Sequence, residues 1–465
     1  MTHAEELADF VVNASYESLS EEALKHLKYR IIDALGCAIG ALSAEPVRLI
    51  REQIEDFTEL SNQGKATLIG GGKTAPDRAA FYNCALVRYL DFNDSYLAKH
   101  ETCHPSDNLG AVLAASEYAN VSGRDLLTAL AVAYQVQCRL SDEAPVRAKG
   151  FDHTTQGAYA VAAGISKALG LNRAQTANAI AICGTAFNAL RVTRTGALSH
   201  WKGLAYPNLA GCATHATFLA MRGITGPLAV FEGNKGFMDS IAGEFRIDWP
   251  KEDLERVRRT IIKKYNAEIH AQSAVEATLE LRAKETFRAA QVAAVTVEIF
   301  DVAYHIIGGG DEGDKTTVWT KEEADHSLPY IIAAALLDGE VMPAQYEPER
   351  IHRQDIQELL RKVRVRPLPE FSDRFPDELP CRVTVELEDG QQLTQEKRDY
   401  RGFYTRPMDR SDVLEKFLRL THHFLDPSLQ KEIFEAVEGL DQMRVTELTS
   451  LLGRARQTEK QMTQR

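Results

Sequence analysis

Residues 91–108, DFNDSYLAKHETCHPSDN, gather three aspartates, two histidines and a glutamate in one connection between two segments that read as helices. Carboxylate and imidazole groups are the side chains that most often move protons in catalysis. Asp91 and Asp94 follow the first helix, and His104 stands at the start of the second, where free N–H groups favour a bound carboxylate. A structural interpretation also exists, in which Ser106 caps the helix and His104 is an ordinary loop histidine.

Two later segments place a histidine and a lysine at comparable positions. In KGFDHTTQGAYA, His153 stands just before a helix rich in Gly and Ala. It can be a functional residue, or it can be only a polar residue that suits the start of a helix. In RTGALSHWKGLAYPNLAG, Lys202 follows Trp201 and precedes a helix that we expect to begin near Asn208. A lysine there can bind an anion, or it can be only a solvated surface charge.

The segment IIKKYNAEIHAQSAVEA carries Lys263, Lys264 and His270. It lies where the sequence pattern changes from helices alone to a mixture of strands and helices. Small-molecule sites concentrate at domain boundaries, so these residues are candidates for substrate binding. By spacing alone, one lysine can be a surface residue and His270 can face a core helix.

A further segment, GDKTTVWTKEEADHSLPY, has Asp325 and His326 just ahead of a strongly apolar helix. The structural interpretation, in which Asp325 or Ser327 is the N-cap of that helix, is at least as good as a functional one.

The elements that must position these residues change in character along the chain. Up to about residue 260 we expect helix after helix: Ser20 is an N-cap candidate, and Ser122 with Asp125 forms a variant of the capping box. Ala- and Gly-rich segments let these helices approach closely. After about 265, the alternation in AAVTVEIFD predicts a strand, and CRVTVELEDGQQLTQEKR predicts a hairpin that turns on Asp389 and Gly390. The tail from Ser411 returns to helical periodicity.

The sequence therefore predicts a mainly α protein. Residues 1–264 and 405–465 form a large all-helical domain, and residues 265–404 form a smaller α+β domain inserted before the C-terminal helices. The Ala-rich helices also allow an α-solenoid, although no repeat of fixed period is present.

Composition excludes several classes of partner. The formal net charge of −12 argues against nucleic acid and anionic membranes, which require a basic face.

No run of eighteen apolar residues and no signal peptide is apparent, so we expect a cytoplasmic protein or, with a lost presequence, an organellar one. Seven cysteines without a CxxC pair give little support to zinc or disulfide frameworks, and no nucleotide-binding glycine motif occurs.

Together these segments resemble the MmgE/PrpD family, which includes 2-methylcitrate dehydratase and cis-aconitate decarboxylase. The matching motifs are DFNDS followed by HPSDNLGAVLAA, GFDHTT, WKGLAYPNLAG with FLAMRGITGP, KKYNAEIHAQSAVEA, and ADHSLPYIIAAALLDG. They run in order over residues 5–450. The resemblance implies a lid-like α+β domain, a homodimer, a site in the cleft between domains, and a tricarboxylate-like substrate handled without metal or organic cofactor.

The resemblance also implies which residues form the site. Carried over by motif, the family's active-site positions fall on Asp91, Ser95, His104, His153, Lys202 and Lys263. Ser95 replaces a frequent threonine and keeps its hydroxyl, and the double lysine leaves open whether Lys263 or Lys264 points inward. We expect Asp91, His104 and His153 to be catalytic, and Ser95, Lys202, Lys263, Lys264 and His270 to bind substrate.

These residue types suit the dehydration of a tricarboxylate such as 2-methylcitrate or citrate. The reaction needs a base for the proton beside a carboxylate and an acid for the departing hydroxyl. We expect Asp91 or His104 to exchange the proton and His153 to be its partner, in either order, while the lysines hold carboxylates and balance the charge of an enolate-like transition state. A cis-aconitate decarboxylase, a related dicarboxylate isomerase or epimerase, and a non-enzymatic helical scaffold are the alternatives.

Overall fold

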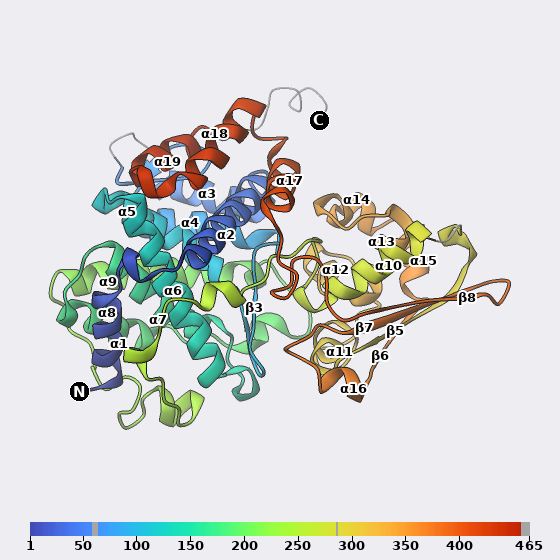
Figure 1. The fold of residues 1–465 in the computed structure, drawn as a ribbon, viewed down its shortest axis with the longest axis horizontal. Helices are drawn as coiled ribbons and strands as arrows, with labels where there is room; N and C mark the ends of the chain where they lie inside the picture. The colour runs from blue at the N-terminus through green and yellow to red at the C-terminus, as the bar shows by residue number, and fades with distance from the viewer. Residues whose placement is uncertain (58–63, 285–286, 457–465) are drawn as a thin grey trace. The chain divides into compact units, whose positions relative to one another are not determined.

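The computed structural model describes residues 1–57, 64–284 and 287–456, and the chain forms two compact units (Figure 1). The larger unit comprises Met1–Arg191, Gly203–Thr260 and Asp409–Arg465, and the smaller comprises Val192–Lys202 and Ile261–Met408. We placed the boundaries at 264/265 and 404/405, and we assigned Val192–Lys202 to the helical part. The mainly α fold with a smaller α+β part is confirmed.

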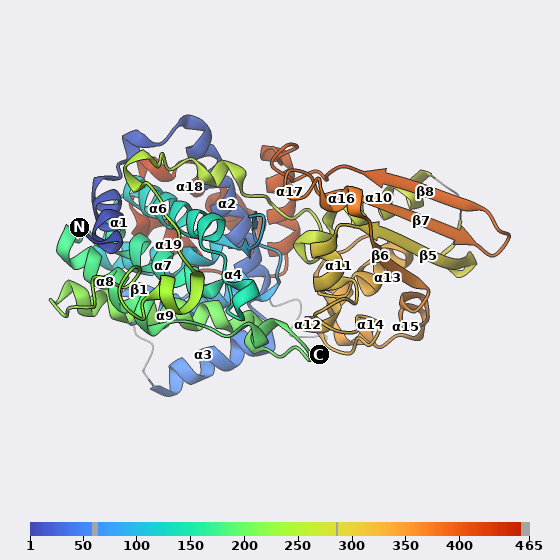
Figure 2. The ribbon, with the colours of Figure 1, turned by 90° about the horizontal axis from the view of Figure 1, so that it is seen from below.

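The larger unit is mainly α-helical, as Figure 2 also shows. Residues 222–260, where we expected further helices, instead form turns, two 3-10 helices and one short π-helix. They are α1 (His3–Asn13), α2 (Glu21–Gly40), α3 (Glu45–Phe57), α4 (Pro76–Tyr89), α5 (Leu109–Ala119), α6 (Gly123–Glu143), α7 (Thr154–Ala168), α8 (Arg173–Ala186), α9 (Trp201–Met221), α17 (Arg410–Thr421), α18 (Pro427–Glu438) and α19 (Val445–Leu452). The first two residues of α9 are counted with the smaller unit. Helices α6 and α7 pack together in the core, and α17 packs against α2.

Local sequence signals explain where several helices begin and how closely they pack. The side chain of Ser20 accepts a hydrogen bond from the backbone of Ala23, which confirms it as the N-cap of α2. Ser122 and Asp125 form the reciprocal capping box of α6. A Cβ on Gly164 of α7 would lie 2.9 Å from Cβ of Ala133, so the small residues do allow α6 and α7 to approach closely.

Two short ribbons interrupt the helices and were not predicted. Strands β1 (Ala66–Thr67) and β2 (Lys73–Thr74) form the first, and β3 (Tyr96–Leu97) and β4 (Thr102–Cys103) form the second. The second ribbon folds the connection after α4 back on itself, because Tyr96 pairs with Cys103. A two-residue strand has too short a pattern to be recognised from alternation.

Two predicted helix starts are wrong. Ser106 does not cap an α-helix, because Pro105–Asn108 form a 3-10 turn, η2, and α5 begins only at Leu109. The helix that we expected to begin near Asn208 begins at Trp201, so it includes Lys202, and Pro207 lies inside it. A proline removes one backbone donor, and here the helix continues through that loss.

The smaller unit contains a four-stranded sheet in the order β6-β5-β7-β8. Its strands are β5 (Val292–Ile299), β6 (Val363–Pro367), β7 (Cys381–Leu387) and β8 (Gln392–Lys397). Val295, Val297 and Ile299 are buried, and β7 pairs with β8 through the predicted turn, in which Gly390 has a φ of +87°. Strand β6, parallel to β5, was not predicted.

Short helices complete the smaller unit. They are α10 (Gln272–Lys284), α11 (Asp301–Ile307), α12 (Lys321–Ala324), α13 (Leu328–Asp338), α14 (Pro348–Ile351), α15 (Gln354–Leu360) and α16 (Pro369–Ser372). Helices α10 and α13 pack together beside the sheet (Figure 1). Across both units, none of the helices formed by the described residues has the length and apolar character needed to cross a membrane.

Candidate active site

His104 is buried where β4 passes into η2. Its Nδ1 lies 2.9 Å from the backbone oxygen of Asp94 and 3.0 Å from Oγ of Ser95. A carbonyl oxygen can only accept a hydrogen bond, so Nδ1 carries the proton and donates it. The neutral ring then holds its lone pair on Nε2, which is the nitrogen able to take a proton from a substrate.

The side chain of Asp94 fixes the backbone around His104. Its fully buried carboxylate accepts hydrogen bonds from the backbone N–H of Ser106 at 3.0 Å and from the hydroxyl of Tyr134 at 2.8 Å. Burial raises the pKa of this carboxyl, and the bonds from Ser106 and Tyr134 oppose that rise. We expected free N–H groups at the HPSDN turn to bind a substrate carboxylate. The N–H of Ser106 does not do so, because it donates to Asp94.

His153 immediately precedes α7 and packs on His104. The centroids of the two rings are 5.5 Å apart, with an angle of 74° between their planes. On its other side, His153 stacks on Tyr206 at a centroid distance of 6.4 Å. Its Nδ1 lies 3.3 Å from Oδ1 of the buried Asp152, so a carboxylate is in place to balance a positive charge on the ring.

Asp91 follows the C-terminus of α4 and is buried. Its φ of +52° lies in the left-handed region, which aspartate tolerates better than most residues. The guanidinium of Arg88 donates to Oδ1 of Asp91 at 2.6 Å, and its Nε lies 3.7 Å from Oδ2 of Asp107. Arg88 therefore connects Asp91 to the turn that follows His104.

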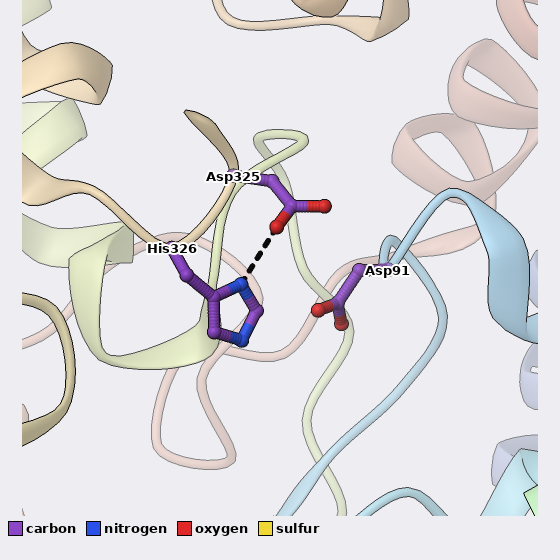
Figure 3. A group of neighbouring side chains, drawn as sticks. All are labelled: Asp91, Asp325 and His326. Atoms are coloured by element: carbon purple, nitrogen blue, oxygen red, sulfur yellow. Dashed lines mark hydrogen bonds and ion pairs between the residues drawn. The ribbon is translucent and has the colours of Figure 1, made fainter. Parts of the chain in front are cut away.

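In the smaller unit, Lys202 belongs to a buried cluster of charged side chains. Its ammonium donates to Oδ1 of Asp325 at 2.8 Å and lies 2.8 Å from Nδ1 of His326. Figure 3 shows the imidazole of His326 turned toward the Asp325 carboxylate, and Nδ1 lies 2.7 Å from Oδ1. Lys321 donates to the other oxygen of Asp325 at 2.7 Å.

The two lysines left open by the sequence differ sharply in burial. Lys263 is completely buried, whereas Lys264 is exposed and places its ammonium 5.6 Å from the centroid of the Tyr265 ring. We therefore retain Lys263 as the candidate for substrate binding and drop Lys264.

His270 is buried and paired with Glu268. Its Nδ1 lies 2.8 Å from Oε1 of Glu268, and its backbone N–H donates to Oε2 at 2.7 Å. Burial alone would raise the pKa of Glu268, but His270, His326 and Lys263 outweigh it and lower the pKa to about 2. The backbone N–H of Glu268 also donates to the carbonyl of Asp325 at 3.2 Å, so the Glu268 and Asp325 clusters adjoin.

The structure thus brings the predicted residues together in two sets. Ser95, His104 and His153 gather in the larger unit, with Asp91 connected to them through Arg88. Lys202 and His270 are joined in the smaller unit through Asp325 and Glu268, and Lys263 is close enough to Glu268 to lower its pKa.

Some residues of these clusters were missed from the sequence. Arg88 and Asp152 lie beside candidate residues in the chain, and nothing in their spacing distinguishes them from surface charges. Asp325 was considered, but an aspartate just before an apolar helix also fits an N-cap. Ser327 fills that role in the structure, because its hydroxyl accepts a hydrogen bond from the backbone of Tyr330.

A substitution at Gly157 should disturb the histidine pair through Tyr206. A Cβ added at Gly157 would lie 2.4 Å from Cε2 of Tyr206, the ring on which His153 stacks. We expect Gly157→Ala to lower the free energy of unfolding by about 1–3 kcal/mol in urea denaturation, because the ring must move. Gly203→Ala is the control, since its Cβ meets nothing within 4 Å and should not destabilise the protein. Equal stability of Gly157→Ala and wild type would contradict this packing.

The lowered pKa of Glu268 predicts an acid-dependent loss of stability. A depressed carboxyl pKa contributes stability that is fully present above the ordinary value of 4.5 and is lost as the pH falls toward about 2. The urea midpoint of Glu268→Gln should therefore fall less than that of the wild type over this pH range. Glu349→Gln, which removes an exposed carboxylate from the same unit, should follow the wild type. Parallel curves for Glu268→Gln and wild type would refute the prediction.

Comparisons with known proteins agree with the resemblance noted in the motifs. The MmgE/PrpD N-terminal domain matches residues 5–250, and the MmgE/PrpD C-terminal domain matches residues 265–442. The 2-methylcitrate dehydratase of Escherichia coli (strain K12) is 29% identical over 96% of this chain and 96% of its own length. The cis-aconitate decarboxylase of Mus musculus is 26% identical over 96% and 93%, respectively, and that of Homo sapiens is 25% identical over 93% and 91%.

Proposed function

The chain belongs to the MmgE/PrpD family, and from this we propose that it is a lyase that dehydrates a tricarboxylate, 2-methylcitrate or citrate, to the corresponding cis-aconitate. The observation that carries the proposal is the packing of His104 on His153, two buried imidazoles that can serve as base and acid. The relatives named as 2-methylcitrate dehydratases favour dehydration over the other reactions.

His104 is the base in this proposal. Its Nδ1–H is donated to the carbonyl of Asp94, so Nε2 accepts the proton from the carbon beside a substrate carboxylate. His153, with Asp152 beside it, protonates the departing hydroxyl, which leaves as water while the carbon–carbon double bond forms. The sequence left Asp91 as an alternative base, but its carboxylate is paired with Arg88, which weakens it as a base.

The buried lysines supply the positive charge that a tricarboxylate requires. Desolvating a carboxylate is costly unless a cation or several donors replace the water. Lys202 and Lys263 are each at most 3% exposed, although the chain as a whole has a net charge of −12. The proposal assigns these lysines and the histidine pair to one reaction.

Incubation of the purified protein with 2-methylcitrate, citrate and cis-aconitate tests this proposal. Growth of absorbance from a conjugated alkene, without release of CO₂, is the expected result for 2-methylcitrate or citrate. Release of CO₂ from cis-aconitate would instead indicate decarboxylation. This is the second candidate function, and the 26% identity to the mouse cis-aconitate decarboxylase supports it.

A thermal-shift titration separates an enzyme from a helical scaffold. A ligand at one hundred times its dissociation constant stabilises the folded state by about 2.7 kcal/mol. At least one of the three acids should raise the melting temperature, whereas a scaffold without a polyanion site should respond to none of them. Tricarballylate, which has three carboxylates but no hydroxyl to lose, should stabilise the protein without being consumed.

A further inference from the structure

We infer that Asp325 is a positioning residue that holds Lys202 and His326 in one fixed arrangement for the reaction. The inference rests on the proposed function, in which Lys202 binds a carboxylate of the substrate. It adds two residues, Asp325 and His326, to those assigned to the site.

The first argument is that the Asp325 carboxylate bonds side chains and is not needed as a helix cap. It lies between α12 and α13 and is completely buried. One oxygen accepts from Lys202 and the other from Lys321. Capping of α13 is carried out by Ser327, so the structural explanation for an aspartate at this position does not account for it.

The second argument concerns the orientation of the His326 ring. Both Lys202 Nζ and His326 Nδ1 lie within 2.8 Å of Oδ1 of Asp325. Nδ1 of His326 also lies 2.8 Å from Nζ of Lys202, so Nζ, Nδ1 and Oδ1 form one compact triangle in which Asp325 and Lys202 together hold the ring. Asp325 and Lys202 therefore orient the ring through Nδ1, and Nε2 is the nitrogen that the inference assigns to proton exchange or ligand contact.

The third argument concerns the charge of the Asp325 carboxylate and the conformational freedom of the Lys202 side chain. Burial alone would raise the pKa of Asp325, but Lys202, Lys321 and His326 outweigh it and hold that pKa well below its usual range, so the carboxylate is ionised at neutral pH. A lysine ammonium on its four-carbon chain has many rotamers. Because Lys202 is already anchored to an ionised carboxylate, its side chain loses less conformational entropy when the substrate binds.

Kinetics of Asp325 variants test the inference. Asp325→Asn should lower kcat/KM for the tricarboxylate on the order of 10²-fold, with a raised KM, because Lys202 loses its anchor. Asp325→Glu, which keeps the charge, should recover part of this loss. Asp338→Asn is the matched control: it removes the carboxylate that holds Arg350 at 2.9 Å at the far end of α13, and it should leave KM unchanged.

A ¹⁵N spectrum of the imidazoles in the wild-type protein tests the inference without relying on activity or on the folding of Asp325→Asn. With His326 assigned by comparison with His326→Gln, its two ring nitrogens should give the separate signals of a ring held in one fixed hydrogen-bonded arrangement. Averaged signals from a ring that exchanges between tautomers would overturn the inference, and so would wild-type kcat and KM in Asp325→Asn, or an equal rise of KM in Asp338→Asn.

These outcomes separate the two proposals. A wild-type protein that converts tricarboxylates, together with an Asp325→Asn variant of equal activity, removes only the positioning role. A wild-type protein that neither binds nor converts any tricarboxylate removes the proposed function and the positioning role with it.

Discussion

Replacing His104 with alanine should lower kcat on the order of 10²- to 10⁴-fold and leave a folded protein. The expected loss is large because the ring is the proposed base: its Nδ1–H is held by the Asp94 carbonyl, which leaves Nε2 to take the proton. Alanine removes this group, whereas the Asp94 carboxylate, which holds the surrounding loop, remains in place. Steady-state kinetics on the converted tricarboxylate, with circular dichroism for folding, measure the effect.

His100→Ala is the matched control for this variant. His100 lies on the same connection, four residues before His104, but it is exposed. It should keep wild-type turnover. Near-normal turnover in His104→Ala, or an equal loss in both variants, would show that His104 is not the base.

Replacing Lys202 with methionine should lower kcat/KM on the order of 10²- to 10³-fold, since removing one charge of a buried, hydrogen-bonded pair costs about 3–4 kcal/mol. Most of the loss should appear as a raised KM, because the ammonium is proposed to hold a carboxylate in the bound substrate as well as in the transition state. The variant should fold, since Asp325 keeps its bonds to Lys321 and His326. Kinetics over a range of substrate concentrations separate KM from kcat.

Lys264→Met provides the control, because Lys264 belongs to the same unit but is exposed. It should leave both KM and kcat unchanged. If Lys202→Met bound and converted the substrate as the wild type does, the buried cluster would be structural, and Lys202 would not contact the substrate.

Features set by local chemistry could be predicted from the sequence. The N-cap of α2 at Ser20 and the capping box of Ser122 and Asp125 depend on residues at most three positions apart, and both are present. The alternation of Val295, Val297 and Ile299 in β5 is likewise a local pattern with a buried face. Such signals place elements correctly because neighbours in the chain decide them.

Features set by distant contacts could not be derived from spacing. Lys202 and Asp325 are bonded across 123 positions, and the pairing of His104 with His153 depends on how the helices of the larger unit pack. The choice between Lys263 and Lys264 was open because the segment has no helical or strand periodicity that assigns a buried side. The start of α9 was predicted near Asn208, just after Pro207, but the helix continues through this proline and begins at Trp201.

The most direct test is a proton NMR time course of 2-methylcitrate with the wild-type protein, run beside His104→Ala. The wild type should convert the substrate to an alkene tricarboxylate that retains all three carboxylates, and the variant should leave it almost unchanged over the same time. An unaltered spectrum with the wild type for 2-methylcitrate and citrate alike, or equal conversion by the variant, would contradict a dehydratase that uses His104 as its base.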